Sequence, residues 1–194
     1  MTLHADLALA HYGHTDADRI RELLLDVHDE VYAGSDDPLA GREEFARFVD
    51  HWSAREGFAC VVGYDQGESV GYAYGAPLSA ATTWWAKVTP ALSGEFTAET
   101  GMRTFALSEL MVRARWRGTG AAKAIHDELL AGRAEERVTL LVHKEHDKVR
   151  TLYETWGYGK AGDVVPFEGA PDLCTLVREM KGKASTIAED PLSE

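Results

Sequence analysis

The chain has 194 residues, of which 45% are hydrophobic, and a formal net charge of −12 at pH 7. This length and apolar content are typical of one domain with a substantial core, and no apolar run approaches the roughly 20 residues that a membrane-spanning helix needs. The acidic balance argues against nucleic acid and anionic membranes as partners, because phosphate binding requires clustered Lys and Arg. It would suit a small cationic substrate, although solubility alone explains the charge equally well.

The N-terminus and the cysteines bear on the cellular compartment. His4 and Asp6 interrupt the basic start and apolar run of a secretory signal, so we expect a cytoplasmic protein. Cys60 and Cys174 each lie inside an apolar, strand-like stretch. We expect both to be buried free thiols, rather than a disulfide or a nucleophile.

Two amphipathic helices are predicted near the N-terminus. Residues 15–33 repeat apolar side chains on one face, with Thr15 and Asp18 placed as a capping pair. Residues 41–53 show the same helical spacing. Both helices are therefore expected to lie on a core.

A β-hairpin and a long loop follow these helices. Residues 58–64 and 69–75 are strand-like, and the polar, glycine-containing turn between them is typical of a hairpin. Residues 76–103 have no sustained period and are too long for an ordinary connection. Such loops usually carry function.

The C-terminal half alternates strands with helices. In order, the pattern predicts a strand at 105–112, a basic glycine turn at 113–120, a helix at 121–131, a strand at 138–142, a short helix capped by His146 or Asp147, and strands at 164–167 and 173–178. We expect one domain over 1–180. The polar, aperiodic tail at 181–194 is expected to be disordered.

The turn before the helix at 121–131 is the strongest chemical signal. It consists of Arg117, Gly118, Thr119, Gly120, Ala121 and Ala122. Backbone N–H groups at a helix start have no intrahelical partner, and with the helix dipole they favour an anion, while glycine lets the backbone approach a pyrophosphate. The ATP-binding and dinucleotide-binding glycine patterns both fail here on spacing. An ordinary strand-to-helix turn is the alternative.

At these residues the sequence resembles the GNAT superfamily of acyl-CoA-dependent N-acyltransferases. The family signature [QR]-x-x-G-x-[GA] fits 117–122, and also 115–120; we prefer the former because an aromatic residue and Arg-Gly follow a strand that ends in Val. A second family region, N-x-x-A-x-x-L-Y-E-x-x-G-[FY], is echoed over 146–158, where 152–154 and 157–158 coincide. His146 replaces the usual asparagine of that region.

The resemblance implies an α/β (α+β) fold. Its mixed, mostly antiparallel twisted sheet would have about seven strands, beginning near residues 3–12, and about four flanking helices. Strands 4 and 5 would splay apart to admit acetyl-CoA as co-substrate, with a bulge in strand 4, and no metal is implied. The implied cofactor-binding residues are Leu110, Met111 and Val112 through their backbone, the six residues of the 117–122 turn, and His146.

The same resemblance implies two catalytic residues. Glu109 would take the proton of the attacking amine; a water chain, with Glu109 as a structural strand carboxylate, is the alternative. Tyr153 would protonate the departing thiolate. The alternative is that Tyr153 is only an aromatic residue on the helix face that packs in the core.

Two further clusters have weaker interpretations. Trp84 and Trp85 could wall an acceptor pocket, with Glu95 and Glu99 attracting a cation, although loop packing explains them better. The histidines at 143 and 146 have acidic neighbours and superficially suggest metal ligands. We expect no metal there, because these side chains should diverge.

The resemblance predicts an N-acetyltransferase that transfers the acetyl group of acetyl-CoA directly to a primary amine of a small molecule or peptide. One alternative is a non-catalytic acyl-CoA-binding regulatory module of the same fold. Another is a metal-dependent hydrolase built on residues 143–147. A homodimer is compatible with the habit of the family.

Overall fold

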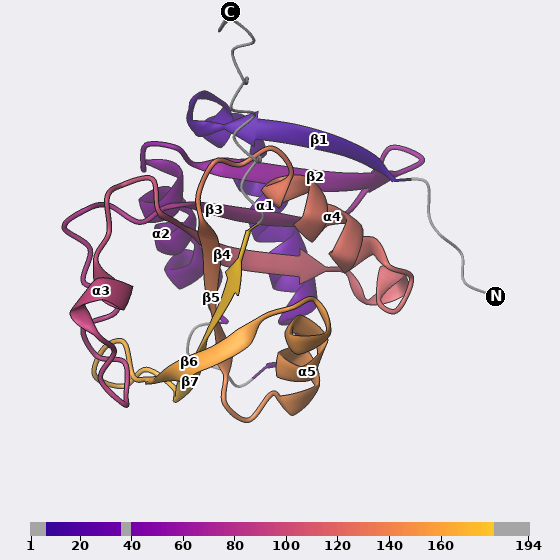
Figure 1. Cartoon of the computed structure of the whole chain (residues 1–194). Coiled ribbons are helices and arrows are strands. Elements are labelled where there is room, and N and C mark those ends of the chain that lie inside the picture. The colour runs from indigo at the N-terminus through magenta and orange to yellow at the C-terminus, as the bar shows by residue number, and fades with distance from the viewer. Residues whose placement is uncertain (1–6, 36–39, 181–194) are drawn as a thin grey trace, which may run out of the picture.

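One seven-stranded sheet organises the molecule. The computed structural model describes residues 7–35 and 40–180. The strand order in the sheet is β1-β2-β3-β4-β5-β7-β6 (Figure 1). Neighbouring strands pair antiparallel except for β4 and β5, which are parallel. The predicted mixed, mostly antiparallel sheet is confirmed.

The elements follow the chain order that the sequence pattern predicts. The strands are β1 (Ala8–Gly13), β2 (Ala59–Asp65), β3 (Glu68–Pro77), β4 (Thr104–Val112), β5 (Arg137–His143), β6 (Gly159–Val164) and β7 (Leu173–Glu179). The helices are α1 (Ala17–Val31), α2 (Arg42–Ser53), the short α3 (Gly94–Thr97), α4 (Ala121–Leu130) and α5 (Asp147–Thr155), with single 3-10 turns at His14–Asp16 and Ala114–Trp116. None of the helices in the described ranges is both long and apolar enough to cross a membrane.

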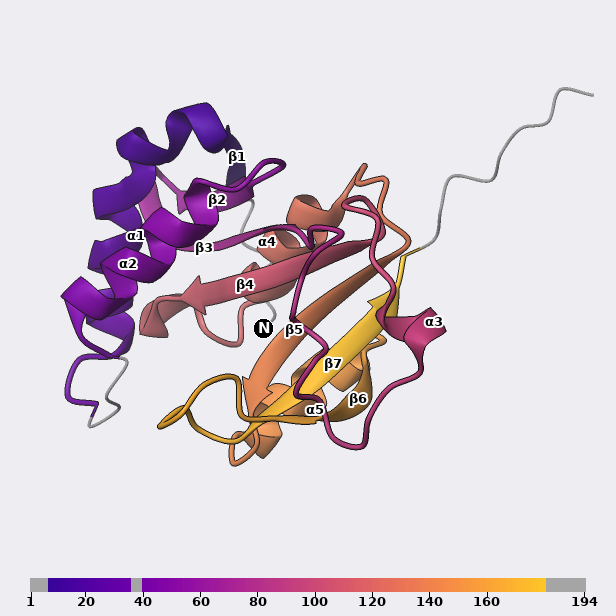
Figure 2. The ribbon, with the colours of Figure 1, turned by 90° about the vertical axis from the view of Figure 1, so that its left-hand side faces the viewer.

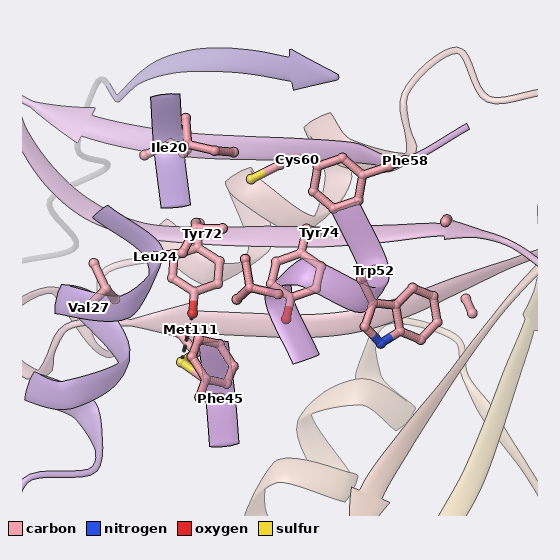
Figure 3. Packing of buried hydrophobic residues seen from close by; sticks show 14 of the residues in the cluster. Ile20, Leu24, Val27, Phe45, Trp52, Phe58, Cys60, Tyr72, Tyr74 and Met111 are labelled. Atoms are coloured by element: carbon pink, nitrogen blue, oxygen red, sulfur yellow. Dashed lines mark hydrogen bonds between the residues drawn. The ribbon is translucent and has the colours of Figure 1, made fainter. Parts of the chain in front are cut away.

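The sheet is covered on both faces. On one face α1 and α2 pack together over the β1–β4 half (Figure 2), and their apolar residues form one core cluster with Tyr72, Tyr74 and Met111. Figure 3 shows this cluster at close range. On the other face, Ile125 of α4 and Tyr153 of α5 belong to a second cluster. Because strand side chains alternate between faces, adjacent residues of β3 and β4 serve different clusters.

The β4 and β5 strands separate along their length. Only Thr104–Ala106 of β4 pairs with β5, opposite Arg137–Thr139. Beyond that point β4 pairs with β3 alone and β5 pairs with β7, so the two strands diverge (Figure 2). Opposite β3, the register shifts between Tyr74 and Gly75, and one extra residue of β4 is accommodated in a β-bulge there. The predicted splay and bulge are both confirmed.

The start of α1 differs from the prediction. The sequence predicts a capping pair of Thr15 and Asp18, but α1 begins at Ala17 and its N-cap residue, Asp16, makes no side-chain capping bond. Instead, the Asp16 carboxylate accepts a hydrogen bond from the Gly13 backbone N–H at 3.0 Å. A 3-10 turn at His14–Asp16 precedes the helix, so the N-cap residue is Asp16 and not the predicted Thr15.

The predicted strand at 164–167 is wrong, because β6 ends at Val164. The strand lies earlier, in a glycine-containing segment whose apolar pattern is weak. A Cβ at Gly162 would lie 2.5 Å from the Val88 side chain and 2.8 Å from the Thr89 carbonyl oxygen. Thr89 also forms a β-bridge with Asp163. Glycine is therefore needed here because the long loop packs directly on the strand.

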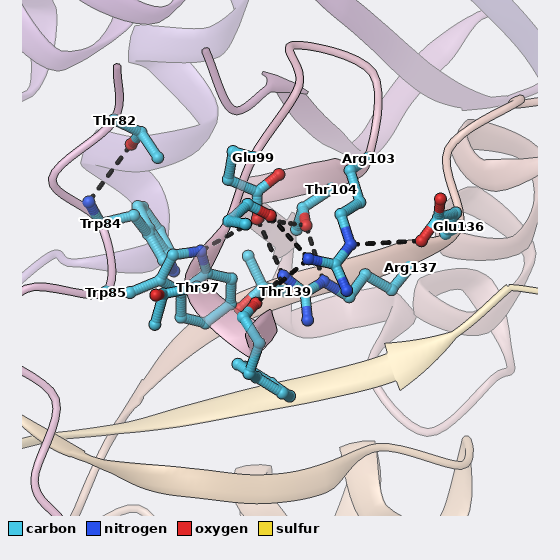
Figure 4. A network of polar contacts seen from close by, with 12 residues as sticks. Thr82, Trp84, Trp85, Thr97, Glu99, Arg103, Thr104, Glu136, Arg137 and Thr139 are labelled. Atoms are coloured by element: carbon cyan, nitrogen blue, oxygen red, sulfur yellow. Dashed lines mark hydrogen bonds and ion pairs between the residues drawn. The ribbon is translucent and has the colours of Figure 1, made fainter. Parts of the chain in front are cut away.

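The long loop at 76–103 is anchored in the protein interior. Within it, Glu99 accepts hydrogen bonds from Trp85 Nε1 at 2.9 Å and Thr104 Oγ1 at 2.7 Å, and pairs with the Arg137 guanidinium at 2.9 Å (Figure 4). The Glu99 and Arg137 side chains are 1% and 2% exposed. Glu99 therefore holds the loop to the sheet, and it cannot attract a substrate cation as suggested from the sequence.

The remaining predictions on the chain have mixed outcomes. Cys60 and Cys174 are buried free cysteines, as expected. The two amphipathic helices and the hairpin are confirmed, with Gln66 and Gly67 at the hairpin turn both at positive φ. The expected disordered tail and the first residues of the chain lie outside the described ranges.

Candidate active site

The gap between β4 and β5 exposes one edge of β4. Leu110, Met111 and Val112 pair with β3 through one edge, opposite Ala73, Tyr72 and Gly71 respectively. On the other edge, β5 pairs only with residues 104–106 of β4. In a strand of this kind the backbone N–H and C=O groups alternate between the two edges, so some groups of 110–112 face the gap. They are placed to pair with an extended ligand, as an added strand would.

The glycine turn follows β4 after the 3-10 turn Ala114–Trp116. Gly118 and Gly120 have φ of +76° and +91°, in the left-handed region that glycine favours. Gly120 is the N-cap residue of α4, so the first N–H groups of that helix lie beside it. A Cβ at either glycine would meet no atom of the described residues within 4 Å, so these residues leave the space in front of the turn open. The turn can therefore admit a diphosphate close to its backbone.

The other residues of the turn support this arrangement. Arg117 Nε donates to the Val112 carbonyl oxygen at 3.1 Å, which ties the turn to the end of β4. No carboxylate of the described residues forms an ion pair with Arg117, whose charge remains available to an anion. Thr119 Oγ1 donates to the Trp116 carbonyl oxygen at 2.7 Å. Ala121 and Ala122 form the first residues of α4.

Glu109 lies at the bulge of β4, where it pairs with Tyr74 of β3 and lines a cleft. Burial raises the pKa of its carboxyl from 4.5 to about 8. No Lys, Arg or His of the described residues forms an ion pair with it. A carboxyl with such a pKa can exchange a proton near neutral pH, as a general base must.

Tyr153 lies on α5, 8% exposed, on the opposite face of the sheet from the cleft. Its ring packs edge-on against Trp156 and Tyr158, with ring centroids 5.3 Å and 5.4 Å away. Burial raises the pKa of the hydroxyl, and the charges of Tyr158 and Glu109 raise it further. The hydroxyl therefore keeps its proton at neutral pH, as a general acid must.

The cleft has a volume of about 610 Å³ and opens on the α1 and α2 face. Its walls come from these helices, the loop at 82–87, the bulged part of β4, and the loop between β6 and β7. Its aromatic lining residues are Tyr32, Phe45, Phe48, Trp52, Trp84 and Phe167. Of the described residues that line it, Glu109 is the one carboxylate. Glu109, the predicted base, therefore lies in a cleft whose wall is rich in aromatic side chains.

The two tryptophans of the long loop separate. Trp84 lines the cleft and packs edge-on against Trp52, with ring centroids 6.3 Å apart. Trp85 is 4% exposed, bonds to Glu99 and does not line the cleft. Only the first of the two is placed to contact an acceptor.

His146 is exposed and precedes α5, where it makes no side-chain capping bond. Its ring stacks on His143, with centroids 4.8 Å apart, and His143 lines the cleft. Within the described residues, no group of three or more His, Cys, Asp or Glu side chains gathers where it could hold a metal. The structure brings His146 to the strand end beside the gap; its contact with a cofactor stays a prediction.

Sequence reasoning missed two cations of the cleft, Arg55 and Lys87. Arg55 follows α2, and Lys87 lies in the aperiodic loop. Neither position has a sequence pattern that points to a site. Arg55 and Lys87 come to the same cleft only when the end of α2 and the long loop fold over β4.

Comparison with known proteins gives the fold. No protein-family model matches the sequence, and no curated protein sequence matches it significantly. Solved structures do match. An acetyltransferase from Thermus thermophilus is 18% identical with a TM-score of 0.59, and the alignment covers 90% of this chain and 97% of that one.

Two further solved structures agree with this match. Aminoglycoside 6'-acetyltransferase type Ii is 15% identical with a TM-score of 0.62, covering 91% of this chain and 99% of that one. An acetyltransferase of the GNAT family from Streptococcus pneumoniae is 14% identical with a TM-score of 0.55, covering 91% and 100%. These likenesses span about nine-tenths of the chain. The chain therefore has the fold of the GNAT acetyltransferases.

Proposed function

We propose that this protein transfers the acetyl group of acetyl-CoA to a primary amine. The observation that carries the proposal is the continuity of the unpaired β4 edge at 110–112 with the open glycine turn at 117–122. An extended amide-containing arm could pair with the strand edge while its diphosphate rests on the turn. Acetyl-CoA has both parts, and its thioester supplies the activated acetyl group. Fold alone does not fix function, so the proposal rests on this site.

Glu109 and Tyr153 would handle the protons. The Glu109 carboxylate takes a proton from the amine nitrogen as that nitrogen bonds to the thioester carbonyl carbon. The C–S bond then breaks, and the Tyr153 hydroxyl gives its proton to the departing sulfur. Proton exchange with solvent restores both side chains. The products are the N-acetyl amine and free CoA.

Ligand-dependent unfolding is the first test. A ligand that binds only the folded state raises the unfolding midpoint in proportion to the logarithm of its concentration. We expect acetyl-CoA and CoA to raise the midpoint, and ATP and NAD to leave it unchanged. No shift with acetyl-CoA at millimolar concentration would refute the proposal.

Turnover is the second test. Release of free CoA thiol should depend on a primary amine added to the protein and acetyl-CoA, and mass spectrometry should find the acetylated amine. A midpoint shift without turnover on a broad panel of amines would instead favour the alternative, a non-catalytic acyl-CoA-binding module.

A further inference from the structure

The cleft differs in charge from the rest of the molecule. The chain carries a net charge of −12, and most of its described Lys and Arg side chains are paired with carboxylates. The cleft lining has the opposite balance, with Arg55 and Lys87 against the one carboxylate of Glu109. The local residues, and not the net charge, set the potential that a bound molecule meets. The negative net charge is therefore a poor guide to the acceptor.

Arg55 is half-buried and has no carboxylate partner in the described part of the chain. Its guanidinium lies over the Trp52 ring, 4.5 Å from the centroid, and one nitrogen donates to the Pro77 carbonyl oxygen at 3.3 Å. Burial lowers the pKa of Arg55, since nothing negative nearby offsets the lost hydration. The remaining donors of its guanidinium have no hydrogen-bond acceptor within residues 7–35 and 40–180, and they can bind an anion in a bidentate fashion.

A second donor lies against the same aromatic ring. Trp84 packs on Trp52, and its indole Nε1 is buried with no hydrogen-bond partner among the described residues. A buried N–H without an acceptor is unfavourable. Lys87 adds positive charge on the loop that crosses the cleft, where its ammonium donates to the Pro166 carbonyl oxygen at 2.7 Å.

The distance along β3 between the residues that Glu109 and Arg55 contact indicates how long the acceptor must be. Glu109 pairs with Tyr74 of β3, and Arg55 bonds to Pro77, three positions further along that strand. Three residues of a strand span about 10 Å. The backbone positions that Glu109 and Arg55 contact are therefore separated along β3, and the Trp52 and Phe45 rings also line the cleft.

We propose that the acceptor is a primary amine with an anionic group, such as a carboxylate, at the far end of an apolar or aromatic linker. Its amine lies at Glu109, its linker on the aromatic wall, and its anionic group on Arg55. This inference rests on the proposed acetyl transfer. An α-amino acid is too short to reach both ends, because its two charges share one carbon, and a polyamine would set a cation against Arg55.

Matched amines test the charge preference. The probes are para-(aminoethyl)benzoic acid, its neutral carboxamide, the diamine with an aminomethyl group in place of the carboxylate, and phenylalanine. We expect kcat/KM for the acid to exceed that for the carboxamide by about 10- to 100-fold, the usual worth of a charge-assisted hydrogen bond. The diamine and phenylalanine should be poorer still. Equal kcat/KM for the acid, carboxamide and diamine would overturn the inference and leave acetyl transfer intact.

Substitutions at Arg55 test whether this residue causes the preference for the acid over the carboxamide. Arg55→Met keeps an apolar stem over Trp52, and the acid-to-carboxamide ratio should fall to about one, while Arg55→Lys should retain part of it. The matched control is Arg47→Met, on the exposed face of α2 beside Glu44, which should keep the full ratio. A ratio unchanged in Arg55→Met would also overturn the inference.

Equilibrium binding makes the test independent of turnover. Calorimetric titration of the acid and the carboxamide into protein saturated with CoA should show tighter binding of the acid, and this difference should vanish in Arg55→Met. No difference in the unsubstituted protein would overturn the acceptor class even if no amine were acetylated. Failure of acetyl-CoA and CoA to bind at all would instead refute the proposed function.

Discussion

The Glu99→Gln substitution would test what holds the long loop to the sheet. Glu99 and Arg137 form an ion pair in which both side chains are almost fully buried (Figure 4). Arg137 also donates to Thr104 Oγ1 and to the Phe96 carbonyl oxygen, both at 2.7 Å. Glutamine keeps the size of the side chain and an acceptor oxygen for Trp85 and Thr104. The substitution therefore removes mainly the negative charge.

The expected loss of stability is large. Breaking a buried ion pair by removing one partner typically costs about 3–5 kcal/mol, because the other charge stays buried and uncompensated. The retained acceptor oxygen and the carbonyl partner of Arg137 favour the lower end, about 3 kcal/mol. With a urea m-value of about 1–3 kcal/mol/M, the unfolding midpoint should fall by about 1–3 M. A domain of typical stability, about 5–15 kcal/mol, would remain folded in water.

Urea denaturation followed by fluorescence and circular dichroism measures this loss. Glu136→Gln is the control, since Glu136 pairs with Arg103 at the surface and its side chain is 68% exposed. It should change stability by less than about 1 kcal/mol. Replacing both members of the buried pair, as Glu99→Leu with Arg137→Met, should recover much of the loss. Equal effects of Glu99→Gln and Glu136→Gln would refute the reasoning.

Three further predictions concern the site. Gly120→Val should weaken acetyl-CoA binding by at least about tenfold in a direct titration, because φ is +91° and a branched side chain would fill the space in front of the turn; unchanged affinity would mean that the cradle lies elsewhere. Tyr153→Phe should lower kcat by about 10²–10⁴-fold with little change in acetyl-CoA affinity, and unchanged kcat would remove Tyr153 from the mechanism. The kcat/KM of the amine should rise with pH through the Glu109 pKa of about 8 as the base ionises, and this limb should be absent in Glu109→Gln.

The regular elements were predictable because local patterns determine them. Helical spacing of apolar residues placed α1 and α2, and Gln66-Gly67 marked the hairpin. The glycine turn before α4 was equally visible, because positive φ at two positions requires glycine. The strand β6 was not predicted, because its sequence is determined by packing against a distant segment and not by a local pattern. Its Gly162 is explained by a loop that is distant in sequence, and single-sequence patterns carry no information on such packing.

The acceptor side of the site was less predictable than the cofactor side. Trp84 and Trp85 are neighbours in the sequence, yet one lines the cleft and the other bonds to Glu99 in the core. An aperiodic loop has no face that a spacing rule could assign. Arg55 likewise becomes part of the site only through α2, β3 and Trp52. The proposed cofactor contacts use backbone geometry that glycine reveals, whereas the proposed acceptor contacts depend on tertiary structure.

Glu109 is the residue at which the proposed chemistry opposes stability. Its pKa rises from 4.5 in the unfolded chain to about 8 in the folded protein, because burial disfavours the charged form. A carboxyl with a raised folded-state pKa binds its proton more tightly when folded, so stability falls as pH rises through this window, by at most about 1.4 kcal/mol per pH unit. The fall ends above the folded-state pKa, and below pH 4.5 the effect is absent.

Glu109→Gln removes this ionisation and keeps the shape of the side chain. The variant should therefore be more stable than the unsubstituted protein at pH 8.5, with a difference that shrinks steadily toward pH 5. Urea unfolding at several pH values measures it, and the exposed Glu145→Gln serves as a control that should show no such trend. A difference independent of pH would mean that Glu109 ionises as freely in the folded protein as in the unfolded chain. Glu109 would then lack the raised pKa that suits it to act as the base, and a water chain would be the better assignment.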